Sequence, residues 1–249
     1  MEAIGSQQNL KGFRPIFIAT MILGLIYVVL VAIWIGVFLG GFAWSSDSKL
    51  QFNWHPLLMS IGMIFLYANS MLLYRSFRTL NKRVLKLGHA TLYAFILLLT
   101  VIALCAVFDS HNFNMKDGKK DPIPNMYSLH SWIGLAAVLL FCCQLLSGFV
   151  TYLYPGLTQH LRMTYMPIHT FFGMGIFICV TVAALLGISE KGFFVIKNIV
   201  DLPAQSILIN IMGICLIMFT GMTIYLVTEK NYKRLPLPED ELLLTSHIN

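Results

Sequence analysis

The sequence predicts an all-α membrane protein with six transmembrane helices. Hydrophobic residues make up 57% of its 249 residues and charged residues only 11%, whereas about 25% of a soluble domain is charged. The charges also avoid six apolar runs, with Lys86 near the start of the third as the one interruption, and each run has the 18 or more residues needed to cross a hydrocarbon core about 30 Å thick. These runs are residues 15–44, 54–74, 84–108, 127–155, 165–188 and 205–228.

In lipid these runs must be helices, because no water is present to bond the backbone groups. The six spans account for most of the chain and leave no room for a soluble domain. We therefore expect an N-terminal segment at 1–14, a transmembrane domain at 15–228 and a C-terminal tail at 229–249. The first run is long enough to remain as a membrane anchor, and no signal-peptide cleavage pattern precedes it.

Basic residues predict the orientation of the spans. The net charge of +6 is carried at span ends, which indicates membrane topology rather than nucleic-acid binding. With six spans, both termini share a side, and that side holds eleven Lys and Arg residues against six on the other. The positive-inside rule then places both termini in the cytosol. The eleven are Lys11, Arg14, Arg75, Arg78, Lys82, Arg83, Lys86, Arg162, Lys230, Lys233 and Arg234.

The first two spans differ in what they carry. Span one contains no ionisable residue and is expected to be scaffold, followed by a turn at Gly40–Trp44. Span two begins at Asn53-Trp54-His55-Pro56. Proline is tolerated in a first helical turn because its missing N–H is not needed there. His55 is therefore expected just inside the outer face.

The third and fourth spans each carry one histidine. A basic cluster from Arg75 to Lys86 leads into span three, and by itself it indicates topology and a solvated face. His89 follows near the cytosolic face. Residues 109–126 form the longest outer loop and include His111, and span four then brings His130 in from the outside.

The fifth span begins with Met166-Pro167-Ile168-His169, after a cytosolic loop at 156–164 that contains Arg162. Span six has no ionisable residue before Glu229. All five cysteines lie inside spans without metal-ligand spacing, so we expect neither a disulfide framework nor a zinc site. They are Cys105, Cys142, Cys143, Cys179 and Cys215.

The four intramembrane histidines fall at two depths. His55 and His130 begin the two spans that enter from outside, whereas His89 and His169 begin the two that enter from the cytosol. Two imidazoles at one depth can hold a flat macrocycle between them, and two such pairs would stack two haems across the membrane. Bis-histidine ligation fills both axial positions of the iron and suits electron transfer. Gly134 and Gly173, one turn after His130 and His169, would let a porphyrin approach.

Two other interpretations of the histidines stay open. Each could be a hydrogen-bonded packing residue, or together they could form a proton relay in a haem-free transporter, since histidine chains mark proton pathways. A relay would be expected to include Asp or Glu within the spans, and the six runs contain none. That composition favours haem.

These residues resemble the cytochrome b561 family of ascorbate-dependent transmembrane oxidoreductases, and its animal branch in particular. The resemblance covers about Gly40 to Lys191. It rests on Phe52-Asn53-Trp54-His55-Pro56, Tyr74-Arg75, Lys82 through His89, Ala106-Val107-Phe108, Tyr127 through Trp132, Leu161-Arg162, Pro167-Ile168-His169 and Gly187-Ile188-Ser189-Glu190-Lys191.

The resemblance implies a six-helix homodimer in which helices 2–5 hold two b haems per chain. It implies cytosolic ascorbate as electron donor, bound by Lys82, Lys86 and Arg162 with Arg75 nearby. An outer acceptor site maps to Phe108, His111, Asn112 and Tyr127, where His111 binds a metal or an organic acceptor or is simply a solvated loop residue. The loop around Lys116–Asp121 looks longer than in the members it resembles.

The resemblance allows monodehydroascorbate, ferric iron or, as a third choice, cupric ion as acceptor. The protein would thus be a monodehydroascorbate reductase or a ferrireductase. In the tail, Glu239 followed by Leu243-Leu244 resembles an acidic dileucine sorting signal. Such a signal would favour a vesicle, endosomal or lysosomal membrane over the plasma membrane, and a tail without a sorting role is an equal alternative.

Overall fold

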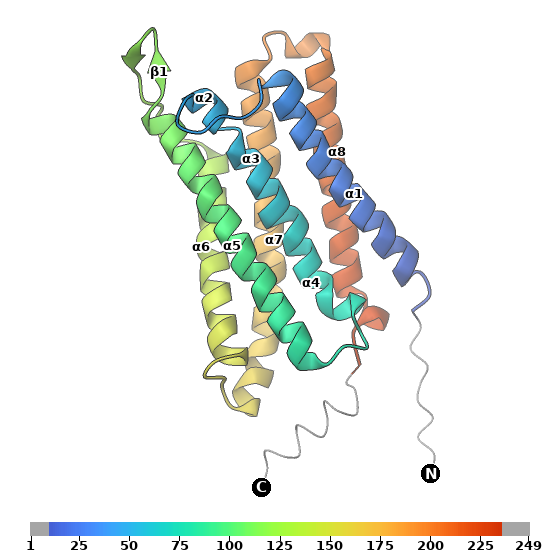
Figure 1. The fold of residues 1–249 in the computed structure, drawn as a ribbon. Helices are drawn as coiled ribbons and strands as arrows, with labels where there is room; N and C mark the ends of the chain where they lie inside the picture. Colours follow the sequence, from blue (N-terminus) through green and yellow to red (C-terminus); the bar gives the residue numbers. More distant parts are fainter. Residues whose placement is uncertain (1–9, 236–249) are drawn as a thin grey trace, which may run out of the picture.

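A computed structural model of the chain describes residues 10–235. Within that range, six helical spans are long and apolar enough to cross a membrane, as the sequence predicts. They lie roughly side by side, and the described chain begins and ends at the same end of the bundle (Figure 1). We call this the terminal end. The opposite end carries a small β-hairpin and is called the hairpin end.

The first two spans are interrupted helices. Span one is α1 (Phe13–Ile33) continued by the π-helix η1 (Trp34–Phe38). Span two comprises α2 (Ser48–Gln51), α3 (Trp54–Met59), the π-helix η2 (Ser60–Leu66) and α4 (Tyr67–Ser76).

The remaining spans are single helices: α5 (Lys82–Asn112), α6 (Leu129–Tyr152), α7 (Gln159–Val195) and α8 (Ala204–Thr228). Between α5 and α6, β1 (Met115–Lys116) pairs antiparallel with β2 (Lys119–Lys120). Short 3-10 turns, η3 (Ile199–Asp201) and η4 (Lys230–Tyr232), flank α8.

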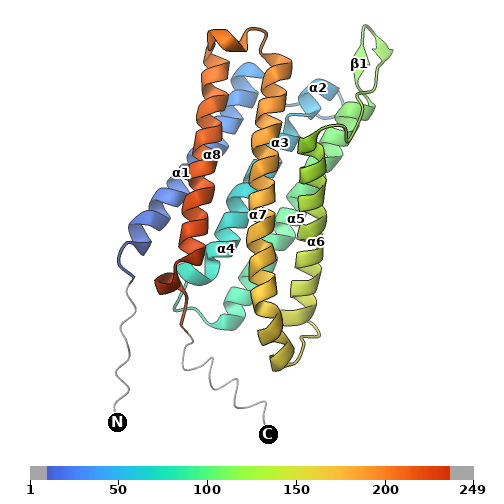
Figure 2. The ribbon, with the colours of Figure 1, turned by 180° about the vertical axis from the view of Figure 1, so that it is seen from behind.

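Spans two to five form a four-helix bundle, and α1 and α8 pack together against one side of it. Span two packs on α5, α5 on α6, α6 on α7, and α7 returns to η2 and α4. Seen from behind, α8 lies in front of α1, which crosses it obliquely, and beside α7 (Figure 2). The core between the helices is aromatic at its centre, where Tyr67, Phe141, Phe177 and Phe219 are almost completely buried.

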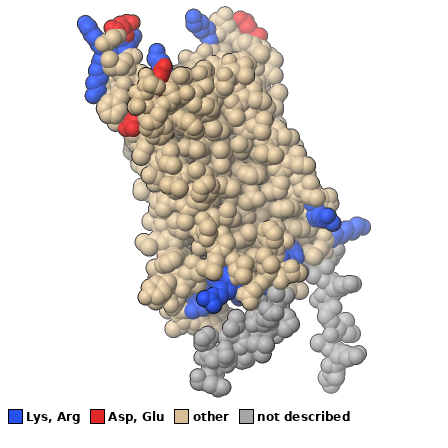
Figure 3. All heavy atoms as spheres, viewed as in Figure 1, with Lys and Arg blue, Asp and Glu red and all other residues tan. Residues whose placement is uncertain are grey.

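The outer surface of the bundle is apolar. Ile22, Leu98, Leu139 and Ile214 are all more than half exposed, which in water would be an aggregation liability and in lipid is the expected state. The charged side chains gather at the two ends, with an uncharged band between them (Figure 3). Among the described residues, the terminal end carries the eleven basic residues named above and a single carboxylate, Glu229. This is a multi-pass membrane protein.

Several helix ends depart from the apolar runs. The apolar run of span one continues to Trp44, but its helix ends at Phe38, before the turn expected at Gly40–Trp44, where Gly40 and Gly41 adopt positive φ of 85° and 88°. Span two starts six residues early, at Ser48, because the Asp47 side chain accepts hydrogen bonds from the N–H groups of Lys49 and Leu50. Both ends are decided by local turn and cap chemistry rather than by hydropathy.

Two expected loop residues lie on helices instead. His111 belongs to the last turn of α5, and Arg162 to the first turn of α7. Helix α7 starts at Gln159 and continues through Pro167, so the proline lies inside the helix rather than near its start. Both helices thus extend beyond the hydrophobic stretch into the interface. The dileucine pattern at Glu239, Leu243 and Leu244 lies outside the described residues.

Candidate functional site

The structure places His55 of α3 beside His130 of α6 at the hairpin end. Their ring centroids lie 6.1 Å apart with the rings nearly perpendicular, at 87°. The Nδ1 atom of each ring pairs with a backbone carbonyl: His55 with Ala103 at 3.3 Å and His130 with Ala183 at 2.7 Å. This pairing assigns the proton to Nδ1 and leaves both Nε2 atoms as acceptors.

Local structure fixes both residues of this pair. Buried Asn53 donates to the carbonyls of Leu39 and Gly41 at 3.2 and 2.7 Å, which ties the start of span two to the preceding turn. His130 is the second residue of α6, whose first turn is held by a capping box between Ser128 and Ser131. Such a reciprocal cap satisfies two backbone donors and sets where the helix begins.

A second pair, His89 of α5 and His169 of α7, lies at the terminal end. The ring centroids are 6.3 Å apart and the planes meet at 59°. His89 Nδ1 lies 3.1 Å from both the hydroxyl and the carbonyl oxygen of Ser70. His169 Nδ1 is buried and has no hydrogen-bond partner within residues 10–235.

Glycines on the facing helix make room for one histidine of each pair. A Cβ at Gly187 would lie 2.8 Å from His130 Cε1, and a Cβ at Gly148 would lie 3.0 Å from His169 Cε1. Gly134 and Gly173, the glycines expected from sequence to make room, would instead meet Ala183 and Gln144 at ordinary contact distances if they carried a Cβ. The close approaches therefore occur across the α6–α7 interface, where the two antiparallel helices each present a histidine to the other's glycine.

The two pairs fit an axially ligated haem. Two imidazoles that bind one metal ion from opposite sides, each through a nitrogen about 2 Å away, hold their centroids roughly 6 Å apart. Three of the four rings have Nδ1 engaged with an oxygen, so that Nε2 is the nitrogen available to iron. Within residues 10–235, no group of three or more His, Cys, Asp or Glu side chains could hold a metal ion on its own. Pairs, rather than larger clusters, are what a macrocycle with four in-plane ligands needs.

A cavity of about 900 Å³ adjoins the hairpin-end pair, within the size range of small-molecule and cofactor sites. Most of its wall is apolar and comes from all four bundle spans, with Val31 and Trp34 of span one added. Span one thus lines the cavity as well as serving as scaffold. The wall also includes Tyr27, Met63 and Met212, which places its inner end deep in the bundle.

The mouth of this cavity contains most of the predicted acceptor residues. The cavity is lined by Phe108, His111 and Tyr127, whereas Asn112 is not part of its lining. Asn125 connects Asn112 to His111: its side-chain oxygen lies 3.0 Å from His111 Nδ1, and its amide donates to Asn112 at 2.9 Å. His111 also stacks on Phe52, with centroids 6.3 Å apart and planes at 7°.

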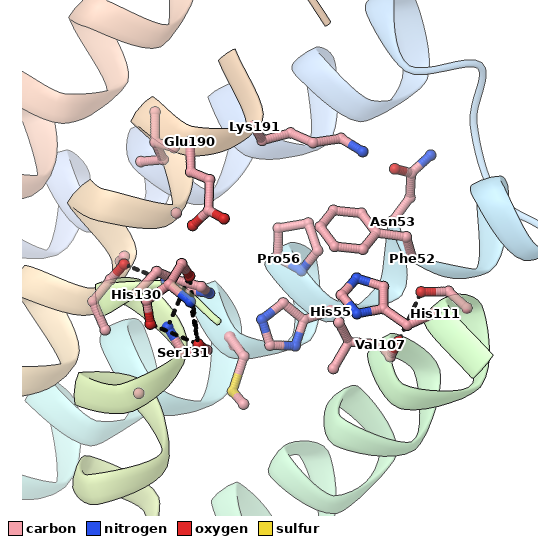
Figure 4. Close-up of a pocket in the computed structure, with 18 of the residues that line it drawn as sticks. Phe52, Asn53, His55, Pro56, Val107, His111, His130, Ser131, Glu190 and Lys191 are labelled. Carbon is pink, nitrogen blue, oxygen red and sulfur yellow. Dashed lines mark hydrogen bonds between the residues drawn. The ribbon is translucent and has the colours of Figure 1, made fainter. Parts of the chain in front are cut away.

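Two charged side chains at the mouth, Glu190 and Lys191, were absent from the candidates drawn from sequence. Both extend from the end of α7 toward the space above the histidine rings (Figure 4). The Lys191 ammonium lies 4.1 Å from the centre of the Phe52 ring, a cation–π contact. Burial raises the pKa of the Tyr127 phenol, and the negative charge of the nearby Glu190 carboxylate raises it further. The sequence signal was a charge pair directly after an apolar run, which is equally typical of a topology signal.

The terminal-end cations divide into two groups. Lys86 lies close enough to Arg162 and Lys82 to feel the charges of both. Its ammonium donates to the Tyr152 carbonyl at 3.3 Å, and the Tyr152 ring lies 5.5 Å from the His169 ring. These three cations therefore share one surface beside the His89–His169 pair.

Arg75 is not part of that surface. Its guanidinium donates to the Glu229 carbonyl at 2.7 Å, at the end of α8. Arg78 donates to the carbonyls of Tyr232 and Lys233, and Arg234 donates back to those of Arg78 and Leu80. The structure thus gives Arg75 a role in holding the C-terminal segment against α4, apart from Lys82, Lys86 and Arg162.

Comparison with known proteins identifies the family. The family model of eukaryotic cytochrome b561 matches residues 54–195, which is more than half of the chain. The chain belongs to the cytochrome b561 family. That stretch contains all four paired histidines, and membership of a b-type cytochrome family implies that the chain binds haem b.

Individual relatives extend the match to nearly the whole chain. The Caenorhabditis elegans CYB561 homolog is 39% identical over 241 residues, covering 94% of this chain and 90% of the relative. The human transmembrane ascorbate-dependent reductase CYB561 is 39% identical over 231 residues, with 92% and 88% covered. The Xenopus laevis plasma membrane ascorbate-dependent reductase CYBRD1 is 36% identical over 231 residues, with 91% and 79% covered.

Proposed function

We propose that this protein transfers electrons across a membrane from cytosolic ascorbate, through two bis-histidine b haems, to an acceptor on the other side. The observation that carries the proposal is the arrangement of four histidines as two pairs, one near each end of the bundle, each with a ring spacing of 6.1 or 6.3 Å. The names of the relatives, ascorbate-dependent reductases, supply the donor.

Lys82, Lys86 and Arg162 form the proposed donor site at the terminal end, which we place in the cytosol. Ascorbate is a monoanion at neutral pH, and a surface that carries cations without carboxylates raises its local concentration. Lys86 is the most direct contact because it is partly buried and its ammonium meets the Tyr152 carbonyl beside His169. Arg162 is held close by, with its Nε–H donating to the Leu157 carbonyl.

The chain's own residues would bind, orient and insulate the cofactors. His89 with His169, and His55 with His130, would hold one haem b each, and iron so ligated passes single electrons without opening a site for oxygen. Between the two pairs, Tyr67 stacks on Phe177 and meets Phe141 at a tilt of 53°, and all three rings are almost completely buried. That packing excludes water from the middle of the membrane, so that charge crosses as electrons alone.

The acceptor site proposed at the hairpin end combines His111, Tyr127 and Phe108 with Lys191 and Glu190, and Asn112 holds His111 through Asn125. Monodehydroascorbate or ferric iron would be reduced there, which corresponds to monodehydroascorbate reductase or ferrireductase activity. We further propose that the protein works as a homodimer, as the family resemblance implies.

A visible spectrum of the detergent-purified protein, recorded before and after addition of ascorbate, tests the proposal. We expect a sharp α band of low-spin b haem to develop with ascorbate, at two haems per chain. Vesicles loaded with the oxidant and supplied with ascorbate outside should then show internal reduction. A colourless protein, purified after expression with haem supplied, would refute the proposal and favour a haem-free transporter that uses its histidines to move protons.

A further inference from the structure

The C-terminal segment is anchored beside α4 before it reaches the loop that follows that helix. Tyr232 is only 4% exposed and packs with Leu72 of α4 and Leu226 of α8 in a small core of its own. Its hydroxyl donates to the Lys11 carbonyl at 3.0 Å, and its ring meets Phe13 edge to face with centroids 5.2 Å apart. The backbone that follows Tyr232 therefore starts from a fixed point at the terminal end.

Two arginines join this segment to the loop between α4 and α5. The Arg234 guanidinium donates to the carbonyls of Arg78 and Leu80 at 3.2 and 3.1 Å. In return, Arg78 donates to the carbonyls of Tyr232 and Lys233. Both arginines are half-buried, and a planar guanidinium can hold two acceptors at once in a fixed geometry. The loop and the C-terminal segment thus hold each other from both sides.

The loop itself, residues 77–81, has few other contacts that would fix its shape. Phe77 and Leu80 are 51% and 42% exposed. Among the backbone–backbone hydrogen bonds of the described chain, one closes the loop on itself, from the Leu80 N–H to the Phe77 carbonyl at 3.3 Å. A segment with little buried surface and few internal bonds opens easily unless something outside it holds it. The two bonds from Arg234 supply that hold.

The same loop determines where α5 begins. Asn81 is the N-cap of α5, and its side chain accepts a hydrogen bond from the Arg83 N–H at 2.7 Å. Lys82 is the first residue of the helix, and Lys86 lies four residues further on, which places both on one face. The Leu80 carbonyl that the guanidinium holds comes two residues before Lys82. A displacement of this carbonyl therefore moves Lys82 first, while Lys86 is a full turn inside the helix.

We propose that Arg234 is a positioning residue of the donor site: by fixing the loop before α5, it holds Lys82 beside Lys86, where both cations meet the bound anion. The inference rests on the proposed function. Arg234 is one of eleven basic residues at this end, so its charge does not distinguish it. Its hold on two carbonyls of the loop does, and it acts on ascorbate through the backbone that carries Lys82.

Steady-state rates with ascorbate varied, measured on purified protein of known haem content, test this inference. Arg234→Lys keeps the positive charge but replaces the planar fork with a single ammonium, whereas Arg234→Gln loses both the charge and the fork. Because either change releases the loop, we expect both variants to raise the KM for ascorbate by about two- to fivefold, as for part of one hydrogen bond to a charged group. The kcat at saturating ascorbate and the haem content should not change.

A double-mutant cycle shows whether Arg234 acts through Lys82. In a Lys82→Gln background the cation that Arg234 positions is already gone, so Arg234→Lys should cause no further rise in KM. Arg14, an exposed arginine on α1 at the same end, provides the matched control. Arg14→Lys and Arg14→Gln should both keep the KM of the wild type.

Four results would overturn the inference. They are an unchanged KM in both Arg234 variants, a rise in Arg234→Gln alone, an equal rise in the Arg14 variants, and a further rise in the double variant. A rise in Arg234→Gln alone would show that the charge acts directly, and a further rise in the double variant that Arg234 acts elsewhere.

A lower kcat or haem content in Arg234→Lys would show a general structural role and would also overturn the inference. If Arg234→Gln does not fold, the conservative variant Arg234→Lys decides. A wild-type protein whose haem is not reduced by ascorbate would instead refute the proposed function itself.

Discussion

The two histidine pairs are almost identical in spacing and unlike in their surroundings. The His55–His130 pair adjoins a large cavity whose mouth carries both Glu190 and Lys191, and its Nδ1 atoms meet backbone carbonyls. The His89–His169 pair is packed among Tyr74, Tyr93 and Tyr152 and lies beside a surface of cations. The spacing determines what can bind between the rings, whereas the surroundings determine what each bound group exchanges electrons with.

The charges at the two ends show the same contrast. Within the described residues, Glu229 is the single carboxylate at the terminal end, and it lies by Arg75 rather than by Lys86. At the hairpin end the six basic residues are matched by six acidic ones. A surface of one sign concentrates an anionic donor, while a mixed surface can accept partners of either sign. The asymmetry gives the proposed electron path its direction.

The largest expected effect comes from removing one histidine of each pair. If each pair holds one haem, as proposed, His130→Ala and His169→Ala should each reduce the haem content from two per chain to one. The haem content of purified protein, measured as the pyridine haemochrome, checks this. The two variants should lose different components of the α band. Loss of the same component in both would show that the histidines do not work as the pairs described.

The glycines opposite the histidines offer a second way to separate the sites. Gly187→Ala would place a methyl group 2.8 Å from His130, and Gly148→Ala one 3.0 Å from His169. Because overpacking costs about 1–3 kcal/mol, we expect loss of haem from the hairpin-end pair in the first variant and a weaker loss from the terminal-end pair in the second. Gly175→Ala, with nothing within 4 Å, is the control and should keep both haems.

The donor surface can be tested through Lys86. Lys86→Gln should raise the KM for ascorbate about tenfold, the effect of losing roughly 1.4 kcal/mol of charge attraction. Salt should raise the KM of the wild type and have less effect on the variant, since screening weakens what the variant already lacks. Lys230→Gln, an exposed cation at the same end, serves as control. An unchanged KM in Lys86→Gln would remove this surface from the donor site.

The smallest effect is expected at the mouth of the cavity. Asn125→Ala would free His111 by removing its 3.0 Å partner, so that His111 spends less time stacked on Phe52. We expect a change of about two- to threefold in the KM for the acceptor, corresponding to part of one hydrogen bond, and no change for ascorbate. Steady-state rates with each substrate varied in turn measure this, with Asn198→Ala as control at the same end. A change in the KM for ascorbate instead would contradict the separation of the two ends.

Hydropathy and charge alone predicted the number of spans and their alternation. The start of span two, by contrast, depended on the Asp47 cap, which hydropathy does not register. The extension of α7 through Pro167 could not be foreseen either, because a proline inside a helix is read from sequence as a start or a break. The helical turns that extend past an apolar run into the membrane interface carry polar residues, so their sequence resembles that of a loop.

The residues of the candidate site likewise divide into those that the sequence could predict and those that it could not. The four paired histidines could be identified because an ionisable residue inside a membrane span is rare and costly, so that it marks a functional position. They are His55, His89, His130 and His169. Gly148 and Gly187 could not be identified, since glycine is common in membrane helices and only the α6–α7 contact shows which ones face a ring. Arg75 could not be separated from Lys86 by sequence, because both belong to one basic cluster.

The sequence by itself determined six spans, four intramembrane histidines and their two depths, since hydropathy and residue spacing along a helix fix depth. The tertiary structure decided the azimuth of each side chain, and with it every partner of the rings. The π-helix Ser60–Leu66 lies between His55 and Ser70, and its wider turns rotate the following residues away from the positions that a regular helix would give them. Ser70 meets His89 of α5, and Tyr67 reaches the Gly173 carbonyl of α7, only because three helices converge at that rotation.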